Sequence, residues 1–396
     1  MSPREGRAAA LGAALIVAAL AWVALRAEVE TESAVPAVRG SSFPWYFSDG
    51  RAGVAEPAPA ASAASASPAD DVPHFEVCGF GRRALPPDEP ASAAGALPPD
   101  DWPELEAAAA VAAQRMAAQL QGESDERSRA IGLWLADVYE RLLGKGTPSP
   151  AGGAPRAALV GLALRTRDAE VYARAWAACH PGSGPTNADD DGHGCERLSI
   201  DQWARLDPGN AVPWLWSLQR ASAQHSQPEL SEALYRLGQS TRFDDGFGRA
   251  PAQILALEPA ELPSGLQALV AVSASGIESL NLPAFGALSQ VCERAALADA
   301  NRRALCEAVA ERLVDASGSK LALAVGIGVG KRLGWPAARV QALERQYREA
   351  AQVLQARAPR DFASCEGVPA LRSYFRNVAA HGELGAARAA MALPTQ

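Results

Sequence analysis

The chain has 396 residues, a formal net charge of −8 and 48% hydrophobic residues. The acidic balance excludes a broad nucleic-acid-binding surface, because such a surface needs clustered Lys and Arg to displace the counterions of the phosphates. Alanine and leucine dominate the hydrophobic residues and β-branched runs are scarce, which favours helices over strands.

The first predicted element is an apolar segment, Ala8–Leu25, which contains neither charge nor proline. As a helix rising about 1.5 Å per residue it would span roughly 27 Å, just short of the hydrocarbon thickness of a bilayer. Arg4 and Arg7 precede it, and positively charged flanks stay in the cytoplasm. We therefore expect residues 1–27 to form an uncleaved single-pass anchor in a bacterial inner membrane, with the rest of the chain in the periplasm.

Two other interpretations of this apolar segment stay open. A cleaved signal peptide has the same charge pattern with a shorter apolar core, and Ala19–Ala21 fits a small-x-small cleavage site. The other interpretation is a buried helix of a soluble domain. A lipid-modified anchor is not expected, because no cysteine lies near the end of the segment.

Residues 28–100 are predicted to form a disordered linker. Ala55–Asp71 is a Pro/Ala/Ser tract that buries too little apolar surface to offset the entropy of ordering, and a second proline-rich stretch covers Ala84–Pro103. Two islands interrupt the linker. The aromatic cluster Phe43–Phe47 either packs on the membrane or the domain, or forms a short docking motif for a partner. The extended island His74–Gly81 brings the first cysteine close to the domain.

From Asp101 onward, apolar residues recur with the period of a helix. Asp101 is the expected cap of the first helix, with Pro103 in its first turn. Further helices are expected at Ser124–Leu143, Ala154–Leu164, Asp168–Cys179, Cys195–Leu206, Ala211–Ala223, Pro228–Ser240, Leu262–Ser273, Pro283–Ala298, Arg302–Ala316, Lys320–Leu333, Pro336–Ala356 and, with a break, Val368–Met391. Short connections make neighbouring helices antiparallel. The predicted fold class is all-α: residues 101–396 form stacked helical hairpins, as an α-solenoid or an irregular helical domain.

The segment Trp203–Trp214 reads WARLDPGNAVPW and resembles the junction between two tetratricopeptide repeats. In that family one helix ends at Leu-Asp-Pro, Asn-Ala opens the next, and a Trp packs between the paired helices. Pro208 cannot continue the first helix and Asn210 can cap the second. Ser217 and Leu218 depart from the family pattern, and no period of 34 runs through the domain. The resemblance implies α-solenoid-like packing rather than a counted repeat array.

Six cysteines form an even set in a compartment that permits disulfides. Asp299 is the expected cap between two helices, with Cys292 seven residues before it and Cys306 seven after it. In an antiparallel hairpin the two cysteines lie at the same height, so a disulfide is predicted between them.

The remaining four cysteines suggest two more disulfides. Cys179 closes one helix and Cys195 opens the next, so a disulfide would join the ends of the polar, glycine-rich loop between them. Cys78 and Cys365 are left to pair by elimination. The alternative is that some cysteines are free and act as small buried hydrophobic residues.

Two metal-like patterns occur in this loop. Asn187, Asp189, Asp191 and Gly192 resemble the start of a calcium-binding EF-hand loop, but Leu198 stands where the bidentate glutamate is needed. We therefore interpret the loop as a solvated acidic segment.

The second pattern is a zinc-like set. His180 and His193 lie beside Cys179 and Cys195, which is a possible zinc set. Outside the cytoplasm these cysteines are expected to oxidise instead, so no metal site is predicted.

Gly326, Gly328 and Gly330 precede Lys331, which is faintly similar to a phosphate-binding loop. The spacing is wrong and Arg332 replaces the required Ser or Thr. We interpret the glycines as small residues that allow close helix approach.

No catalytic or cofactor-binding residue is predicted, because the chain contains neither a GxSxG nor an HExxH motif. The leading functional hypothesis is a membrane-anchored periplasmic scaffold or adaptor that binds a protein or peptide partner without catalysis. The first alternative is an envelope enzyme that acts on cell-wall material through a pocket assembled from distant helices. The second is a structural protein with no fixed ligand.

Overall fold

The computed structural model describes residues 74–84, 102–143, 153–180, 194–258, 261–280 and 285–392. The predicted anchor, the aromatic cluster Phe43–Phe47 and most of the predicted linker lie outside these ranges. In the part of the chain that is described, no helix combines the length and the apolar character needed to cross a membrane.

The described chain is almost wholly α-helical, as the composition and periodicity predict. The first group of helices is α2 (Pro103–Gly122), α3 (Glu126–Leu143), α4 (Ala154–Ala163), α5 (Ala169–Cys179), α6 (Ile200–Leu206), α7 (Val212–Ala223) and α8 (Gln227–Gln239). The second group is α9 (Arg249–Ala256), α10 (Ser264–Leu280), α11 (Phe285–Val291), α12 (Ala300–Asp315), α13 (Lys320–Leu333), α14 (Ala337–Arg357) and α15 (Gly367–Ala392). Short 3-10 turns occupy Cys195–Arg197 and Ala296–Ala298.

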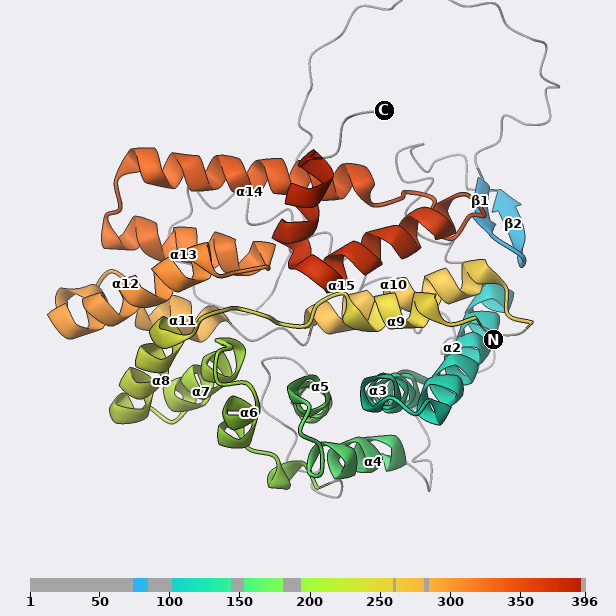
Figure 1. Cartoon of the computed structure of the whole chain (residues 1–396), viewed down its shortest axis with the longest axis horizontal. Coiled ribbons are helices and arrows are strands. Elements are labelled where there is room, and N and C mark those ends of the chain that lie inside the picture. Colours follow the sequence, from blue (N-terminus) through green and yellow to red (C-terminus); the bar gives the residue numbers. More distant parts are fainter. Residues whose placement is uncertain are drawn as a thin grey trace, which may run out of the picture.

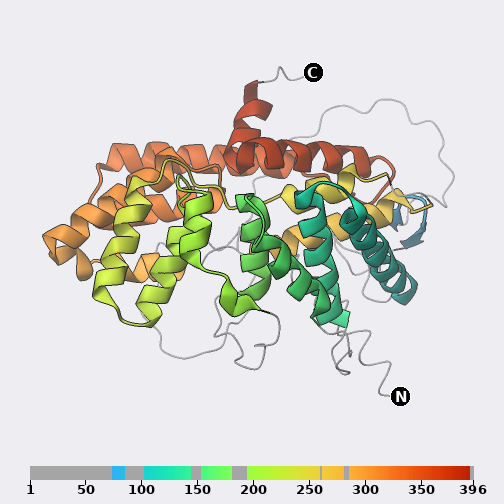
Figure 2. The ribbon, with the colours of Figure 1, turned by 60° about the horizontal axis from the view of Figure 1, so that its bottom comes forward.

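The helices form two layers that are joined at both ends (Figures 1 and 2). Helices α2 to α8 pack side by side in chain order, with α4 alongside α3 and α5. In the other layer α12, α13, α14 and α15 follow one another, and α9 and α10 pack beside α15. The layers meet where α10 contacts α2 and where α8 contacts α12. The helix contacts therefore form a closed circuit around the middle of the domain.

Local signals in the sequence account for most helix starts. The side chains of Asp168, Ser199, Asp299 and Ser319 accept hydrogen bonds from backbone N–H groups in the first turns of α5, α6, α12 and α13. Such caps satisfy donors that have no partner inside the helix. Proline stands in the first turn of α2, α4, α7 and α8. Its fixed φ fits the helix there, and its missing N–H removes no hydrogen bond within the helix. The first helix begins at Pro103, while its expected cap, Asp101, lies outside the described residues.

Four parts of the helical fold differ from the expectation. The helix expected over Cys195–Leu206 is divided into a 3-10 turn at Cys195–Arg197 and α6, which begins at Ile200 because Ser199 caps it there. Helix α9 was not predicted, because it has only eight residues and lacks a side-chain cap of its own at the first turn. The helix expected over Pro283–Ala298 is shorter: α11 ends at Val291 and a 3-10 turn follows at Ala296–Ala298. Helix α10 extends seven residues past the predicted end at Ser273, to Leu280. The break expected in the last helix is present at Gly382, whose φ of 67° is left-handed.

A β-hairpin lies within the range that the sequence assigns to the linker. Strands β1 (His74–Val77) and β2 (Gly81–Ala84) pair in antiparallel fashion. Phe75 and Val77 are buried, and the Phe75 ring packs edge-on against Phe362. The extended island predicted at His74–Gly81 is therefore part of a hairpin that packs against the helical domain.

Candidate functional site

All six cysteines are paired, in the three combinations that the sequence predicts. The Cα–Cα distances are 5.8 Å for Cys292–Cys306 and 5.6 Å for Cys179–Cys195. The third disulfide, Cys78–Cys365, has a Cα–Cα distance of 4.6 Å and joins residues 287 positions apart. Asp299 caps α12 as expected and accepts a hydrogen bond of 2.7 Å from the Arg302 N–H. The predicted pairing of Cys292 with Cys306 is confirmed, although Cys292 lies just after the end of α11 and not inside a long helix antiparallel to α12.

The third disulfide fixes the hairpin to the starts of two helices. The Cys78 N–H donates to the Ala363 carbonyl at 2.8 Å, just before α15. The Gly265 N–H in the first turn of α10 donates to the Cys78 carbonyl at 3.0 Å. A Cβ on Gly265 would lie only 2.4 Å from the Cys78 nitrogen, so this close approach requires glycine.

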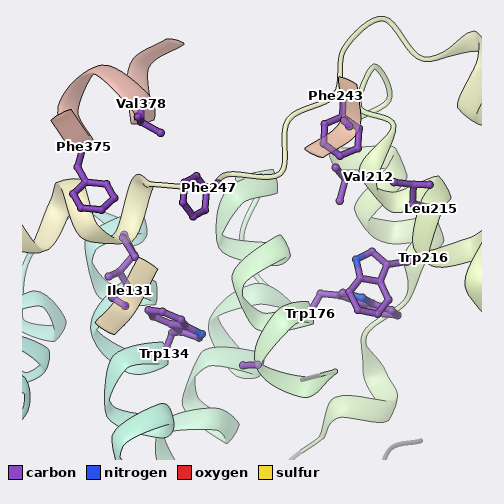
Figure 3. Packing of buried hydrophobic residues seen from close by; sticks show 14 of the residues in the cluster. Ile131, Trp134, Trp176, Val212, Leu215, Trp216, Phe243, Phe247, Phe375 and Val378 are labelled. Carbon is purple, nitrogen blue, oxygen red and sulfur yellow. The ribbon is translucent and has the colours of Figure 1, made fainter. Parts of the chain in front are cut away.

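An irregular segment, residues 241–248, crosses the middle of the domain between α8 and α9, and we call it the central segment (Figure 1). It runs beside two turns, with a parallel bridge from Arg242 to Asn210 and another from Phe243 to Ser317. Phe243 and Phe247 are buried and anchor it in the core (Figure 3). Because the segment is partly buried outside regular structure, its backbone polar groups need hydrogen-bond partners.

Side chains satisfy the backbone groups that the central segment leaves outside regular structure. Asn210 accepts from the Asp244 N–H at 3.1 Å and donates to the Asp244 carbonyl at 2.8 Å. The Gly246 N–H donates to Asp244 and the Phe247 N–H to Asp245, each at 3.1 Å. The central segment is therefore held in one conformation although it is neither helix nor strand.

Glu278 of α10 binds the end of the central segment and the start of α9. Its carboxylate accepts from the Gly248 N–H at 2.8 Å, the Ala250 N–H at 3.1 Å and the Arg174 guanidinium at 2.8 Å. Glu278 thus acts as the cap that α9 lacks locally. Burial raises the pKa of Glu278, and the charge of Arg174 opposes that rise.

Arginines and carboxylates alternate on one side of the central segment. Arg249 of α9 contacts Asp244 at 2.6 Å and Glu170 of α5 at 3.1 Å. Arg127 of α3 contacts Asp168 at 2.6 Å and Glu170 at 3.4 Å. Burial would lower the pKa of Arg249, but Asp244 and Glu170 outweigh it and raise the pKa. These ion pairs therefore join α3, α5, α9 and the central segment into one charged network.

Three adjoining cavities follow this network, and we call them together the central cleft. The first, the arginine cavity, has about 300 Å³ and is lined by Arg127, Arg167, Asp168, Ala169, Glu170, Asp207, Arg242, Asp244 and Arg249. The second, the tryptophan cavity, has about 80 Å³ and includes Trp176, Trp203, Trp216, Arg174 and Glu278 in its lining. The third, the carboxylate cavity, has about 210 Å³ and includes Asp244, Asp245, Arg249, Ser319, His381 and Glu383. Asp244 and Arg249 line all three.

Asp245 is a second carboxyl group of the cleft whose pKa is raised. Its pKa is raised to about 7, chiefly by burial and also by the negative charges of Glu383 and Asp244, while the hydrogen bond from the Phe247 N–H lowers it. Glu383 follows the kink of α15 and accepts from the Lys320 N–H at 3.0 Å. Asp245 therefore exchanges its proton near neutral pH at the wall of a cavity.

The wall of the tryptophan cavity contains the residues that resemble a tetratricopeptide junction. The ring centroid of Trp176 lies 6.3 Å from that of Trp203 and 6.2 Å from that of Trp216. Figure 3 shows Trp176 and Trp216 side by side. Asn210 accepts a hydrogen bond of 3.2 Å from the Val212 N–H at the start of α7, although Ala211 holds the cap position. The structure therefore gives Asn210 two roles, at α7 and at the central segment.

The zinc-like set of the sequence is not assembled. Cys179 and Cys195 form a disulfide, and the His180 ring stacks on Trp176 with centroids 3.9 Å apart. Burial lowers the pKa of His180. His193 and the calcium-like run over residues 187–192 lie outside the described residues. Among the residues that are described, no three His, Cys, Asp or Glu side chains are placed to hold a metal ion.

Sequence reasoning missed the charged residues of the central cleft. The run Phe-Asp-Asp-Gly-Phe over residues 243–247 offered one signal, because two phenylalanines around two acids are unusual in a solvated loop. Glu278 lies in the part of α10 beyond the predicted end. Arg249 and Glu170 are separated by 79 residues, so no local pattern indicates that they meet.

Comparison of the chain with protein-family models, with curated proteins and with solved structures found no match in any of the three.

Proposed function

We propose that this protein is a membrane-tethered binding protein of the bacterial periplasm, which holds a peptide or a flexible segment of a partner protein in the central cleft without catalysis. The observation that carries the proposal is the cleft itself: three adjoining cavities around Asp244 and Arg249. Binding sites in proteins are concave and place polar groups at defined positions, and the hydrogen-bonded central segment supplies such positions.

The outer surface of the described residues offers little apolar area to a partner. The exposed large hydrophobic side chains are Val111 on α2, Tyr235 on α8 and Met391 on α15. They stand on three different helices, whereas an apolar docking surface needs a contiguous patch. Recognition through charge in the cleft is therefore favoured over recognition through an exposed apolar face.

The proposed location rests on the apolar segment Ala8–Leu25 and on the disulfides. Disulfides persist in oxidising compartments and are rare in the cytoplasm. Three of them, with every cysteine paired, fit a domain exported past the membrane. We further infer that α7 and α8 are a tetratricopeptide-like hairpin preceded by α6, which is supported by Asn210 at the start of α7 and by the packing of α7 against α8.

Site-specific photocrosslinking in cells tests the proposed function. A photoreactive residue at Ala169 or Ala380 lies in the lining of the arginine or the carboxylate cavity. The matched control is Ala342, which is exposed on α14 away from the cleft. We expect the same protein segment to be crosslinked from Ala169 and Ala380 and not from Ala342. Equal labelling at all three positions, or none at either cleft position, contradicts the proposal.

One observation favours a second candidate, an envelope enzyme that acts on cell-wall material. A general acid works best when its pKa lies near the operating pH, and the pKa of Asp245 is about 7 beside Glu383. Incubation of the full chain with purified peptidoglycan tests this candidate. Release of soluble fragments that is lost in Asp245→Asn favours the enzyme, and no release in either protein argues against it.

A further inference from the structure

The tryptophan cavity brings together three buried indole rings whose N–H groups have no acceptor. Trp176 of α5, Trp203 of α6 and Trp216 of α7 line it and are 6%, 4% and 7% exposed. The N–H of a buried tryptophan usually finds a hydrogen-bond partner. None of these three has one among the residues that the structure describes. The Nε1 atom of Trp176 is fully enclosed by protein, so a ligand in the cavity would reach the donors of Trp203 and Trp216.

The three rings are held in place by contacts within the protein. His180 stacks on Trp176 with centroids 3.9 Å apart and does not line the cavity, so it supports the Trp176 ring from another side. Trp176 and Trp216 form a T-shaped pair with centroids 6.2 Å apart. The Cys179–Cys195 disulfide joins the end of α5 to the 3-10 turn before α6. A preformed site of this kind avoids the entropic cost of ordering its side chains when a ligand binds.

The volume of the tryptophan cavity limits what can enter it. An apolar cavity of about 150 Å³ accepts one benzene molecule, which has six carbon atoms. The tryptophan cavity has about 80 Å³, which corresponds to about three carbon atoms on the same scale. An aromatic side chain or a sugar ring is too large for this space. The three ring methylenes of a proline, or the three side-chain carbons of a valine, match it.

The hydrogen-bond groups that remain unused in this cavity are chiefly donors. Every carboxylate in the lining already accepts a hydrogen bond or forms an ion pair: Glu170, Asp207, Asp244, Asp245 and Glu278. The free indole N–H groups therefore favour a ligand group that accepts hydrogen bonds and does not donate them. The amide that precedes a proline is such a group, because its carbonyl accepts and proline has no N–H. This difference favours proline over valine.

We propose, on the basis of the proposed function, that the tryptophan cavity binds a proline of the partner's peptide segment, while carbonyl groups of that segment accept hydrogen bonds from Trp203 and Trp216. The proline ring packs among the indole rings and fills the cavity. Segments that contain proline are largely extended before they bind, so aromatic-lined grooves bind them at a low entropic cost. The flanking residues continue into the arginine and carboxylate cavities, which share Asp244 and Arg249 with the tryptophan cavity.

The test measures peptide binding by calorimetry on the full chain in detergent micelles. The probes are the capped peptide Ala-Ala-Pro-Ala-Ala and the versions with valine or alanine in place of proline. The protein variants are Trp216→Phe, which removes the indole N–H and keeps an aromatic ring, and Ala177→Leu, which fills the cavity from its lining. The matched controls lie outside the cleft lining: Trp335→Phe removes another buried N–H without a described partner, and Ala342→Leu enlarges an exposed alanine of α14.

We expect the wild type to prefer the proline peptide. Alanine in place of proline should weaken binding about tenfold, because about two fewer carbon atoms are buried, and the valine peptide should bind between the two. Trp216→Phe should weaken binding of the proline peptide about threefold to tenfold through the lost hydrogen bond. Ala177→Leu should bind the three peptides equally weakly, and both control proteins should behave as the wild type. Should Trp216→Phe fail to fold, Trp203→Phe takes its place with the same expected loss.

Three results would overturn the inference. Equal binding of the three peptides to the wild type would show that the cavity does not hold the central residue, and no binding by any of them would show that it holds water only. Equal losses in Trp216→Phe and Trp335→Phe would show that the indole N–H acts through stability rather than through the ligand. Crosslinks from Ala169 and Ala380 alongside any of these results would leave the proposed function intact and reject only the proline. The absence of such crosslinks would reject both.

Discussion

The guanidinium of Arg174 lies 2.8 Å from the carboxylate of Glu278, although the two residues are 104 positions apart in the sequence. Their side chains are 10% and 5% exposed. Arg174 also lies over the Trp134 ring, with its Cζ atom 4.9 Å from the centroid. The pair joins α5 in one layer to α10 in the other, at the point where Glu278 caps α9.

Removal of one partner of this pair is expected to destabilise the domain strongly. Glu278→Ala leaves Arg174 buried without its counter-charge and α9 without its cap, which costs about 3–5 kcal/mol of the free energy of unfolding. Urea denaturation followed by circular dichroism measures the loss. The double variant Arg174→Met with Glu278→Gln should recover part of it.

Glu232 provides the matched control for this prediction. It forms an ion pair with Arg236 at 2.7 Å on α8, where both side chains are more than half exposed. Glu232→Ala should change the free energy of unfolding by less than about 1 kcal/mol. A loss in Glu278→Ala no larger than in this control would contradict the structural role of the buried pair.

The titration of Asp245 is expected to make stability depend on pH. Its pKa is about 7 in the folded protein, against an ordinary value of 3.8, so the folded state retains a proton that the unfolded chain has released. The contribution of Asp245 to the free energy of unfolding is fully present below about pH 4 and is lost as the pH rises through about 7. Asp245→Asn should therefore raise the stability relative to the wild type at about pH 8 and change it little at about pH 4.

Denaturation of wild type, Asp245→Asn and Asp201→Asn at both pH values gives the comparison. Groups whose pKa is lowered, such as Glu311 beside Arg339, produce the opposite trend in every protein and cancel in the difference. Asp201→Asn, which removes one exposed carboxyl group of α6 outside the cleft lining, controls for the loss of a negative charge. Parallel stability curves for wild type and Asp245→Asn would rule out the raised pKa.

The glycines of α13 allow a matched packing test. A Cβ on Gly330 would lie 2.2 Å from Cε3 of the Trp335 ring, whereas a Cβ on Gly328 meets no heavy atom within 4 Å. Gly330→Ala should therefore cost about 1–3 kcal/mol through overpacking. Gly328→Ala should be neutral or stabilise by up to about 1 kcal/mol, because alanine favours the helix. Similar effects of the two substitutions in urea denaturation would refute the close contact.

The three disulfides should react with a reductant in an order set by burial. Cys365 is exposed and Cys195 is partly buried, whereas Cys292 and Cys306 are both fully buried. A reductant must reach a sulfur to attack it, so Cys78–Cys365 should open first and Cys292–Cys306 last. Timed alkylation followed by peptide mass spectrometry gives the order. Early labelling of Cys306 under native conditions would mean that α11 and α12 open more readily than their packing implies.

The sequence predicts those parts of this fold that depend on neighbours along the chain. Caps such as Asp168 and Asp299 act within three residues, and the spacing of Cys292 and Cys306 around one turn places them together. Most helices and the two local disulfides can therefore be predicted from the sequence. Apolar periodicity gives the direction of each buried face, but not the helix that will cover it.

The central cleft depends on contacts that no local pattern contains. Glu170 reaches Arg249 across 79 residues, and the Lys320 N–H reaches Glu383 across 63. A carboxyl group such as Asp245 acquires its raised pKa only when the layers close around it. The sequence shows that such residues are present, and the fold decides which of them meet.

The disulfide between Cys78 and Cys365 determines how tension would travel through the molecule. A pull on the chain ahead of His74 reaches Cys78 and crosses covalently to the start of α15, while the hydrogen bond from Gly265 passes part of it to α10. The pulling force does not pass through α2 to α8, because it leaves the chain at Cys78 before it reaches Pro103. The layer of α2 to α8 would therefore keep its shape under strain, and reduction of this one bond would redirect the load onto α2.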